Sequence, residues 1–207
     1  MADHYYTAVP TSEHRPGLTT YEYRGHKLNF ETDSGVFSRT EIDEGTDLLL
    51  RTLPEVMAGD VLDLGCGYGV IGISVAKHWK DTNVLMADVN ERACGLSVQN
   101  AKKNGVAAKV IASDGYANIP EGTFDYILQN PPIRAGKAVI YEMFAQGAAR
   151  LNEGGSLWLV IRKQQGAPSA QTYLKTLFHQ VTIPRKKSGF WIFCCTNPQK
   201  NTEVNEQ

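Results

Sequence analysis

The loop segment "QNPPIRAGK", residues 129–137, contains residue types that could do chemistry. It follows the apolar run "FDYILQ", which predicts a buried strand over 124–129. Pro131 and Pro132 lack the backbone N–H that a sheet ladder needs, so the strand must end there. A rigid loop of this kind is an unusual way to make a simple turn, and it presents the side-chain amide of Asn130 directly after the strand. Asn130 is therefore a candidate functional residue.

Three aspartates lie at or beside the ends of three other apolar runs. Asp63 is in "DVLDLG", Asp88 ends "NVLMAD" and Asp114 is in "ASDG". Ligands of open α/β sheets bind at the carboxyl ends of the strands, so these carboxylates are expected to share one site. Asp63 would suit an ammonium group, Asp88 ribose hydroxyls, and Asp114 an exocyclic amine such as adenine N6. Together they describe S-adenosylmethionine better than NAD.

A glycine-rich turn follows the first of these runs. In "LDLGCGYGVIG", Gly65, Gly67 and Gly69 let the backbone turn sharply and approach a ligand without a Cβ in the way. With Gly72 the segment also matches the G-x-G-x-x-G fingerprint of dinucleotide-binding proteins. That match is weak, because the Asp63 carboxylate would repel a pyrophosphate. The turn is better explained as a cofactor loop for S-adenosylmethionine.

The elements that must position these residues alternate along the chain. Apolar runs predict seven strands, and helical spacing predicts helices at 70–79, 90–104, 138–151 and 169–178, the third ended by Gly154 and Gly155. This order predicts an α/β, Rossmann-like sandwich with a mostly parallel seven-stranded sheet. The last two strands form a hairpin joined by "RKKSG", which makes the last strand antiparallel. The predicted strands are 60–65, 83–88, 108–113, 124–129, 156–161, 180–184 and 189–196.

Composition bounds the remaining possibilities. The 207 residues are 42% hydrophobic and 21% charged with a net charge of −1, which fits one globular domain and does not by itself indicate a nucleic-acid binder. The four cysteines form no C-x-x-C pair and the five histidines show no ligand spacing, so no metal is expected. No membrane span or signal peptide is predicted, and a cytoplasmic protein is expected. The sequence gives no indication of oligomeric state.

The domain organisation is predicted in three parts. An N-terminal extension covers 1–19, a single domain covers 20–196, and a polar tail covers 197–207. Within the domain, a small hairpin over 20–33 turns at Arg24-Gly25, and a helix capped by Asp43 leads into the α/β core at 59–196.

In this order, "VLDLGCGYG", "MADVN", "ASDG" and "QNPPIRAGK" resemble the class I S-adenosylmethionine-dependent methyltransferases. The upstream "TDSGVFSRTEIDEGTDLLL" is similar to one branch, the ribosomal RNA guanine-N2 methyltransferases of the small-subunit methyltransferase C type. The likeness covers roughly residues 20–196. Two-domain members of that branch carry an additional amino-terminal domain, so the chain resembles the single-domain form. The resemblance implies a methyl transfer from S-adenosylmethionine to guanine N2.

The resemblance also implies roles for individual residues. The Asn130 side-chain oxygen and the Pro131 carbonyl would accept the two hydrogens of the target amine, while the two prolines keep the loop rigid. Phe37 in "SGVFS" would pack over the cofactor as a lid. Thr46, with Gly45, could present donors to the methionine carboxylate. Many amino-methyltransferases have an aromatic residue after N-P-P, whereas this chain has Ile133. Either another ring, such as Phe37 or Tyr141, stacks on the target instead, or the target is not a free planar base.

Cations cluster where the last three parallel strands are expected to end. Arg134 and Lys137 follow the fourth strand, Arg162 and Lys163 follow the fifth, and "RKK" at 185–187 follows the sixth. Phosphate contacts dominate RNA affinity, so these residues predict a substrate-binding edge for ribosomal RNA or a small-subunit assembly intermediate.

The sequence leaves three other functions open. N-P-P loops also occur in enzymes that methylate protein glutamine or adenine N6. A non-catalytic RNA-binding assembly factor could keep the fold, although the retained Asp63, Asp88 and Asn130 argue against it. An NAD-dependent oxidoreductase is opposed by Asp63 and by the absence of an evident acid for hydride transfer.

Overall fold

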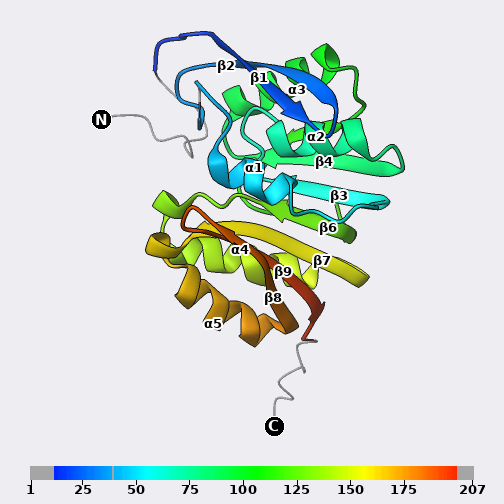
Figure 1. Cartoon of the computed structure of the whole chain (residues 1–207), viewed down its shortest axis with the longest axis vertical. Helices are drawn as coiled ribbons and strands as arrows, with labels where there is room; N and C mark the ends of the chain where they lie inside the picture. The colour runs from blue at the N-terminus through cyan, green and yellow to red at the C-terminus, as the bar shows by residue number, and fades with distance from the viewer. Residues whose placement is uncertain (1–11, 39, 200–207) are drawn as a thin grey trace.

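The computed structural model describes residues 12–38 and 40–199. Its centre is a seven-stranded sheet with the order β5-β4-β3-β6-β7-β9-β8. Five neighbouring strands are parallel, and β9 is antiparallel to both β7 and β8 (Figure 1). The predicted sandwich with an antiparallel last strand is therefore confirmed. The strands are β3 (Gly59–Leu64), β4 (Thr82–Asp88), β5 (Lys109–Ala112), β6 (Phe124–Gln129), β7 (Leu151–Arg162), β8 (Phe178–Lys187) and β9 (Phe190–Pro198).

Helices cover both faces of this sheet because adjacent strand residues point to opposite sides. Val61 of β3 belongs to one core and its neighbour Leu62 to the other. The first core lies under α1 (Glu44–Leu50), α2 (Val70–His78) and α3 (Glu91–Lys103), and the second under α4 (Lys137–Ala149) and α5 (Ala167–Leu177). None of these described helices is long and apolar enough to cross a membrane.

A two-stranded hairpin stands apart from the sheet. It consists of β1 (Gly17–Tyr23) and β2 (His26–Thr32), and it turns at Arg24-Gly25 as predicted. Two asparagines of α3 hold its open edge. The side chains of Asn100 and Asn104 both accept from and donate to the β2 backbone, through Glu31 and Asn29, at 2.7–2.9 Å. These bonds replace those of a neighbouring strand and bring residues 33–38 to the carboxyl edge of the sheet.

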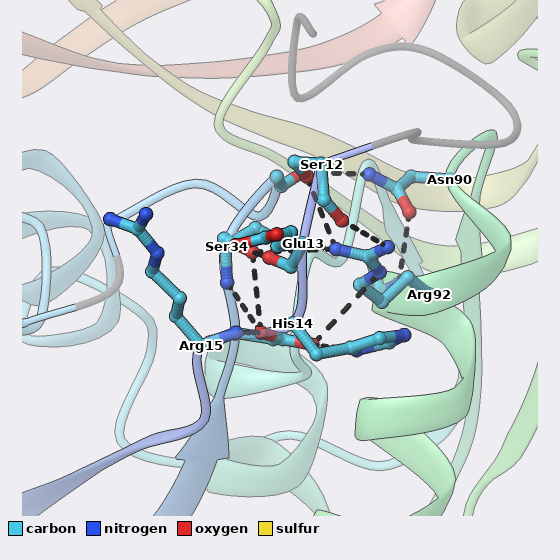
Figure 2. Close-up of polar contacts among 10 residues, drawn as sticks. Ser12, Glu13, His14, Arg15, Ser34, Asn90 and Arg92 are labelled. Carbon is cyan, nitrogen blue, oxygen red and sulfur yellow. Dashed lines mark hydrogen bonds and ion pairs between the residues drawn. The ribbon is translucent and has the colours of Figure 1, made fainter.

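The chain before β1 is fastened to the same region (Figure 2). Asp33 accepts hydrogen bonds from the backbone N–H of Arg15 and of Ser34 at 2.6 and 2.7 Å, and its other oxygen lies 2.5 Å from His14 Nδ1. Arg92, near the start of α3, donates to the Ser12 carbonyl oxygen at 2.9 Å. Residues 1–11 of the expected extension and 200–207 of the expected tail lie outside the described residues.

Two local predictions were wrong. The "RKKSG" segment is not a loop: β8 continues to Lys187, and the turn consists of Ser188 and Gly189, both with positive φ. Cross-strand pairing with β9 extends the strand beyond the point where the cations suggest that it ends.

The second wrong prediction concerns the end of α4, which comes at Ala149. Gly154 and Gly155 do not terminate the helix; they lie inside β7, where the register against β6 shifts. A Cβ at Gly155 would lie 3.0 Å from the Phe124 carbonyl oxygen, so the glycine permits this irregularity.

Candidate active site

The pocket lies at the carboxyl edge of the sheet, where β4 and β6 lie on opposite sides of β3. This is the topological switch point of the sheet, where the strand order reverses direction, and open α/β sheets bind ligands there. Its volume is about 320 Å³, within the range of roughly 300–1,000 Å³ that is usual for small-molecule sites. Most of its wall comes from the loops after β3, β4, β5 and β6, and from residues 36–38, Asp43 and Thr46.

The glycine turn forms the floor between β3 and α2. Gly65, Gly67 and Gly69 have φ values of +77°, +58° and +95°, a region that favours glycine. An added Cβ at Gly65 or Gly67 would meet no atom within 4 Å, so these two positions face open space. Gly72 has a different role: a Cβ there would lie 2.5 Å from Met86 Cγ, so the glycine allows α2 to pack closely on β4.

Asp88 lines the pocket at the end of β4. One of its oxygens accepts from the backbone N–H of Gly67 at 2.8 Å and the other from the N–H of Asn90 at 2.9 Å. Burial raises the pKa of Asp88 above its ordinary value, and the two N–H groups oppose this shift. The carboxylate is thus fixed between the glycine turn and the start of α3, with its position suited to accept from hydroxyls.

Asp63 is fully buried in β3 and does not line the pocket. One oxygen accepts from the N–H of Gly72 at 2.8 Å, while the other has no hydrogen-bond partner in the described residues. Burial raises the pKa of Asp63 to about 7. A buried carboxylate oxygen without a partner is costly unless a ligand or water supplies one.

The far side of the pocket contains the other predicted residues. Asp114 is exposed and lines the wall beside the buried Ser113. Phe37 is 41% exposed and also lines the pocket, so it is not an ordinary core aromatic. Tyr68, which no sequence motif singles out as a site residue, lines it too and donates to the Ser38 carbonyl oxygen at 3.0 Å. This bond ties the Phe37 segment to the glycine turn.

The N-P-P loop closes the pocket on the β6 side. Asn130 and Pro132 line the wall, and Pro131 is buried. The Asn130 amide nitrogen donates to Asp43 Oδ2 at 3.0 Å and to Thr46 Oγ1 at 2.9 Å. A carboxylate can only accept hydrogen bonds, so the atom facing Asp43 must be the NH₂ group. The amide oxygen is therefore the atom left for a ligand.

Thr46 and Asp43 belong to the beginning of α1. Asp43 is the N-cap, as predicted, and accepts from the Thr46 N–H at 2.9 Å. This bond occupies the backbone donor that was expected to reach a cofactor carboxylate, while the Thr46 hydroxyl hydrogen stays available. The sequence identified Asp43 only as a helix cap, since nothing local indicates that it meets a loop 87 residues away.

The remaining substrate candidates lie outside the pocket wall. Ile133 and Arg134 are in the short 3₁₀ helix η1 (Ile133–Ala135), and Ile133 packs on the second core. Lys137 lies 5.0 Å from the ring centre of Tyr141. Tyr141 stacks on Tyr173 at 4.1 Å and does not line the pocket, which leaves Phe37 as the aromatic residue of the expected pair at the site.

The predicted cations do end up at one edge. Arg162 ends β7, Lys163 starts the short helix η2 (Lys163–Gln165), and residues 185–187 end β8, which runs parallel to β7. Arg134 and Lys137 flank the end of η1. Within residues 12–38 and 40–199, ion pairs involve other cations, namely His14, Arg24, Arg51, Arg92 and Lys103. The same ranges contain no cluster of side chains suited to a metal ion.

This fold and glycine turn are those of class I methyltransferases. The structure of the T. thermophilus 16S rRNA N2 G1207 methyltransferase (RsmC), in complex with AdoMet and guanosine, matches with a TM-score of 0.78 and 26% sequence identity. The match covers 90% of this chain and 51% of that one.

Comparison by sequence also identifies relatives. The protein YbxB of Bacillus subtilis (strain 168) is 45% identical, over 93% of this chain and 97% of its own. Ribosomal RNA small subunit methyltransferase C of Pasteurella multocida (strain Pm70) is 42% identical over 68% of this chain. The chain covers only 44% of the length of that relative. The model of the family described as "Methyltransferase small domain" matches residues 27–194, and the chain belongs to this family.

Proposed function

We propose that this protein transfers a methyl group from S-adenosylmethionine to an exocyclic amine, namely guanine N2 of small-subunit ribosomal RNA. Membership of the methyltransferase small domain family supports the reaction type. The complex of the T. thermophilus neighbour with AdoMet and guanosine supports both the cofactor and the acceptor. The observation that carries the proposal is the fixed orientation of the Asn130 amide at the wall of the pocket.

The residues present fit the proposed cofactor. Gly65 and Gly67 leave open space beside the glycine turn, and Asp88 offers two acceptor oxygens for ribose hydroxyls. The unpartnered oxygen of Asp63 is buried behind this turn, so a water would connect it to the ammonium group. Asp114 would accept from the adenine amine, and the Thr46 hydroxyl would donate to the methionine carboxylate. When bound, S-adenosylmethionine supplies an electrophilic methyl group on its sulfonium.

Asn130 and Pro131 would hold the acceptor amine. The Asn130 amide oxygen and the Pro131 carbonyl oxygen each accept one amine hydrogen, which draws the nitrogen lone pair out of conjugation with the ring. Pro131 and Pro132 keep both acceptors in place, because their backbone torsions are restricted. Alignment of reacting groups is worth roughly 7–11 kcal/mol in favourable model systems. Holding the amine in line is therefore the main contribution of this loop.

A guanine amine inside a duplex cannot be reached in line, so the nucleotide must be unpaired or extruded. Phe37 is the aromatic residue best situated to stack on it, since it is exposed at the pocket. Stacking of a base on an aromatic ring is worth about 1–3 kcal/mol. Phe37 would thus take the role that an aromatic residue after N-P-P has in many amino-methyltransferases, and Ile133 would support the loop from the core.

The seven cations at the carboxyl edge of the sheet, named at the end of this paragraph, would bind the RNA backbone. They carry no ion pair in the described part of the chain, so they remain available for phosphates. Such contacts position the substrate without reading its sequence. The substrate would be small-subunit ribosomal RNA, alone or in an assembly intermediate, in the cytoplasm. The seven residues are Arg134, Lys137, Arg162, Lys163, Arg185, Lys186 and Lys187.

Nucleoside mass spectrometry tests the acceptor. Small-subunit RNA from cells lacking the gene should lose one N2-methylguanosine, and purified protein with S-adenosylmethionine should restore it. A matched strain that produces Asn130→Ala protein is the control for catalysis. An unchanged guanosine profile would overturn the guanine assignment. Loss of a methylated adenine in the same spectra, or of a methylated glutamine in a parallel mass spectrum of digested protein, would identify the other acceptors of N-P-P enzymes. No loss in either measurement would favour a non-catalytic assembly factor.

A further inference from the structure

One oxygen of Asp43 connects the two parts of the pocket that come from distant regions of the chain. Asp43 Oδ2 accepts a hydrogen bond from the Thr46 backbone N–H at 2.9 Å, and this bond caps α1. The same oxygen accepts a second hydrogen bond from the side-chain nitrogen Nδ2 of Asn130, in the N-P-P loop, at 3.0 Å. Thr46 Oγ1 accepts from the same nitrogen at 2.9 Å. Both hydrogens of the Asn130 amide are therefore used by α1.

The two acceptors do not have the same effect on Asn130. A threonine hydroxyl can donate or accept, so Thr46 alone would tolerate either orientation of the amide. A carboxylate only accepts, and a flipped amide would bring its oxygen to about the hydrogen-bond distance of another oxygen carrying negative charge. Asp43 thus selects the orientation that leaves the Asn130 oxygen facing a ligand.

The surroundings of Asp43 restrict where its carboxylate can lie. A Cβ at Gly45 would come within 3.0 Å of Asp43 Oδ2 and 2.8 Å of Phe190 Cε1. The glycine therefore makes room for the carboxylate between α1 and β9. Asp43 is only partly buried and itself lines the pocket, so its role is not that of a core residue.

We propose that Asp43 is a positioning residue that fixes the amide of Asn130 for methyl transfer. This proposal rests on the function proposed above, in which the Asn130 oxygen accepts an amine hydrogen. Asp43 does not contact the amine; it acts through Asn130 and the Thr46 end of α1. The consequence is that loss of Asp43 lowers turnover and leaves the affinity for S-adenosylmethionine unchanged.

Substitutions at residue 43 separate this role from helix capping. Asp43→Ser retains a good N-cap but is too short to reach Asn130. Asp43→Asn retains the reach, because its amide oxygen can occupy the position of Oδ2 and accept both hydrogen bonds. We expect Asp43→Ser to lower kcat about 10- to 100-fold, with an unchanged melting temperature and an unchanged cofactor Kd. Asp43→Asn should recover kcat to within a few-fold of wild type.

A measurement on the free protein does not depend on catalysis. In a ¹⁵N NMR spectrum, the Asn130 side-chain NH₂ should give two separate, slowly exchanging proton signals in wild type and in Asp43→Asn. In Asp43→Ser, and to a smaller degree in Thr46→Val, these signals should broaden and exchange faster. The assignment comes from their disappearance in Asn130→Ala.

Several outcomes would overturn the proposal. Wild-type kcat in Asp43→Ser would show that the amide needs no fixing, and unchanged NMR signals would show that Asp43 does not hold it. A rise in cofactor Kd that matches the fall in kcat would make Asp43 a cofactor contact. If wild type methylates no amine while the NMR result holds, the proposed function fails and the structural link between Asp43 and Asn130 stands.

Discussion

The guanidinium carbon of Arg162 lies 4.3 Å from the centre of the Phe190 ring. The register of β7, β9 and β8 pairs Arg162 with Phe190 and Phe190 with Lys187, so the three side chains form a row across the sheet. Phe190 also packs against Gly45 at the start of α1. The row therefore connects the edge strand β8 to the helix whose beginning lines the pocket.

Removal of the two cations of this row should weaken RNA binding without weakening cofactor binding. We expect the double variant Arg162→Ala/Lys187→Ala to raise the Kd for substrate RNA roughly tenfold at moderate salt, because two phosphate contacts are lost. The slope of log K against log salt should become shallower by about 0.7–0.9 per lost contact. Fluorescence anisotropy with labelled ribosomal RNA measures both quantities. S-adenosylmethionine affinity should not change.

A matched control uses two exposed lysines at the opposite edge of the sheet. Lys102 lies in the last turn of α3 and Lys109 begins β5, whereas the pocket lies at the carboxyl ends of the strands. Lys102→Ala/Lys109→Ala removes the same net charge. An equal loss of RNA affinity in this control would mean that only total charge matters and that the row has no specific role.

Asn130→Ala and Asp88→Ala should divide catalysis from cofactor binding. Asn130→Ala removes an acceptor for the amine, and we expect kcat to fall by at least ~100-fold, as when one polar group that stabilises a transition state is lost. Its cofactor Kd should stay within a few-fold of wild type. Asp88→Ala should have the opposite pattern, with its main effect a rise in the cofactor Kd. Isothermal titration calorimetry and single-turnover methylation separate the two, and wild-type turnover in Asn130→Ala would contradict the assigned role.

The buried Asp63 should make stability depend on pH. Its pKa is about 7 in the folded protein and near 3.8 when unfolded, so the folded state binds more protons between these values. The free energy of unfolding should therefore decrease as pH rises from about 4 to 7, by up to about 1.4 kcal/mol per pH unit from this group. Urea titrations across this range measure it. Asp63→Asn should make the free energy of unfolding less dependent on pH. An unaltered slope in that variant would mean that other groups cause the pH dependence.

Two glycines in helices should respond to alanine in opposite ways. Gly72→Ala would put a Cβ 2.5 Å from Met86 Cγ, and this overpacking should lower the free energy of unfolding by about 1–3 kcal/mol. Gly95 in α3 is exposed with no atom within 4 Å of an added Cβ, so Gly95→Ala should raise stability by up to ~1 kcal/mol. Thermal or urea unfolding checks both, and equal effects would mean that the close packing of α2 on β4 is not what requires Gly72.

The order of the elements and the positions of the cofactor loops could be predicted from the sequence, because each depends on local signals. Apolar runs mark buried strands, glycines mark the turn after β3, and two prolines end β6. The ends of the elements were less predictable where pairing decides them. The cations of residues 185–187 suggest a loop, but hydrogen bonding to β9 keeps them in a strand.

The sequence by itself therefore determined which residues gather at one edge, since the carboxyl ends of parallel strands must meet there. Only the tertiary structure decided how those side chains are used. It buried Asp63 behind the glycine turn, directed Tyr141 onto Tyr173, and brought Asp43 to Asn130. These outcomes depend on contacts between segments far apart in the chain, and neither residue spacing nor local propensity contains that information.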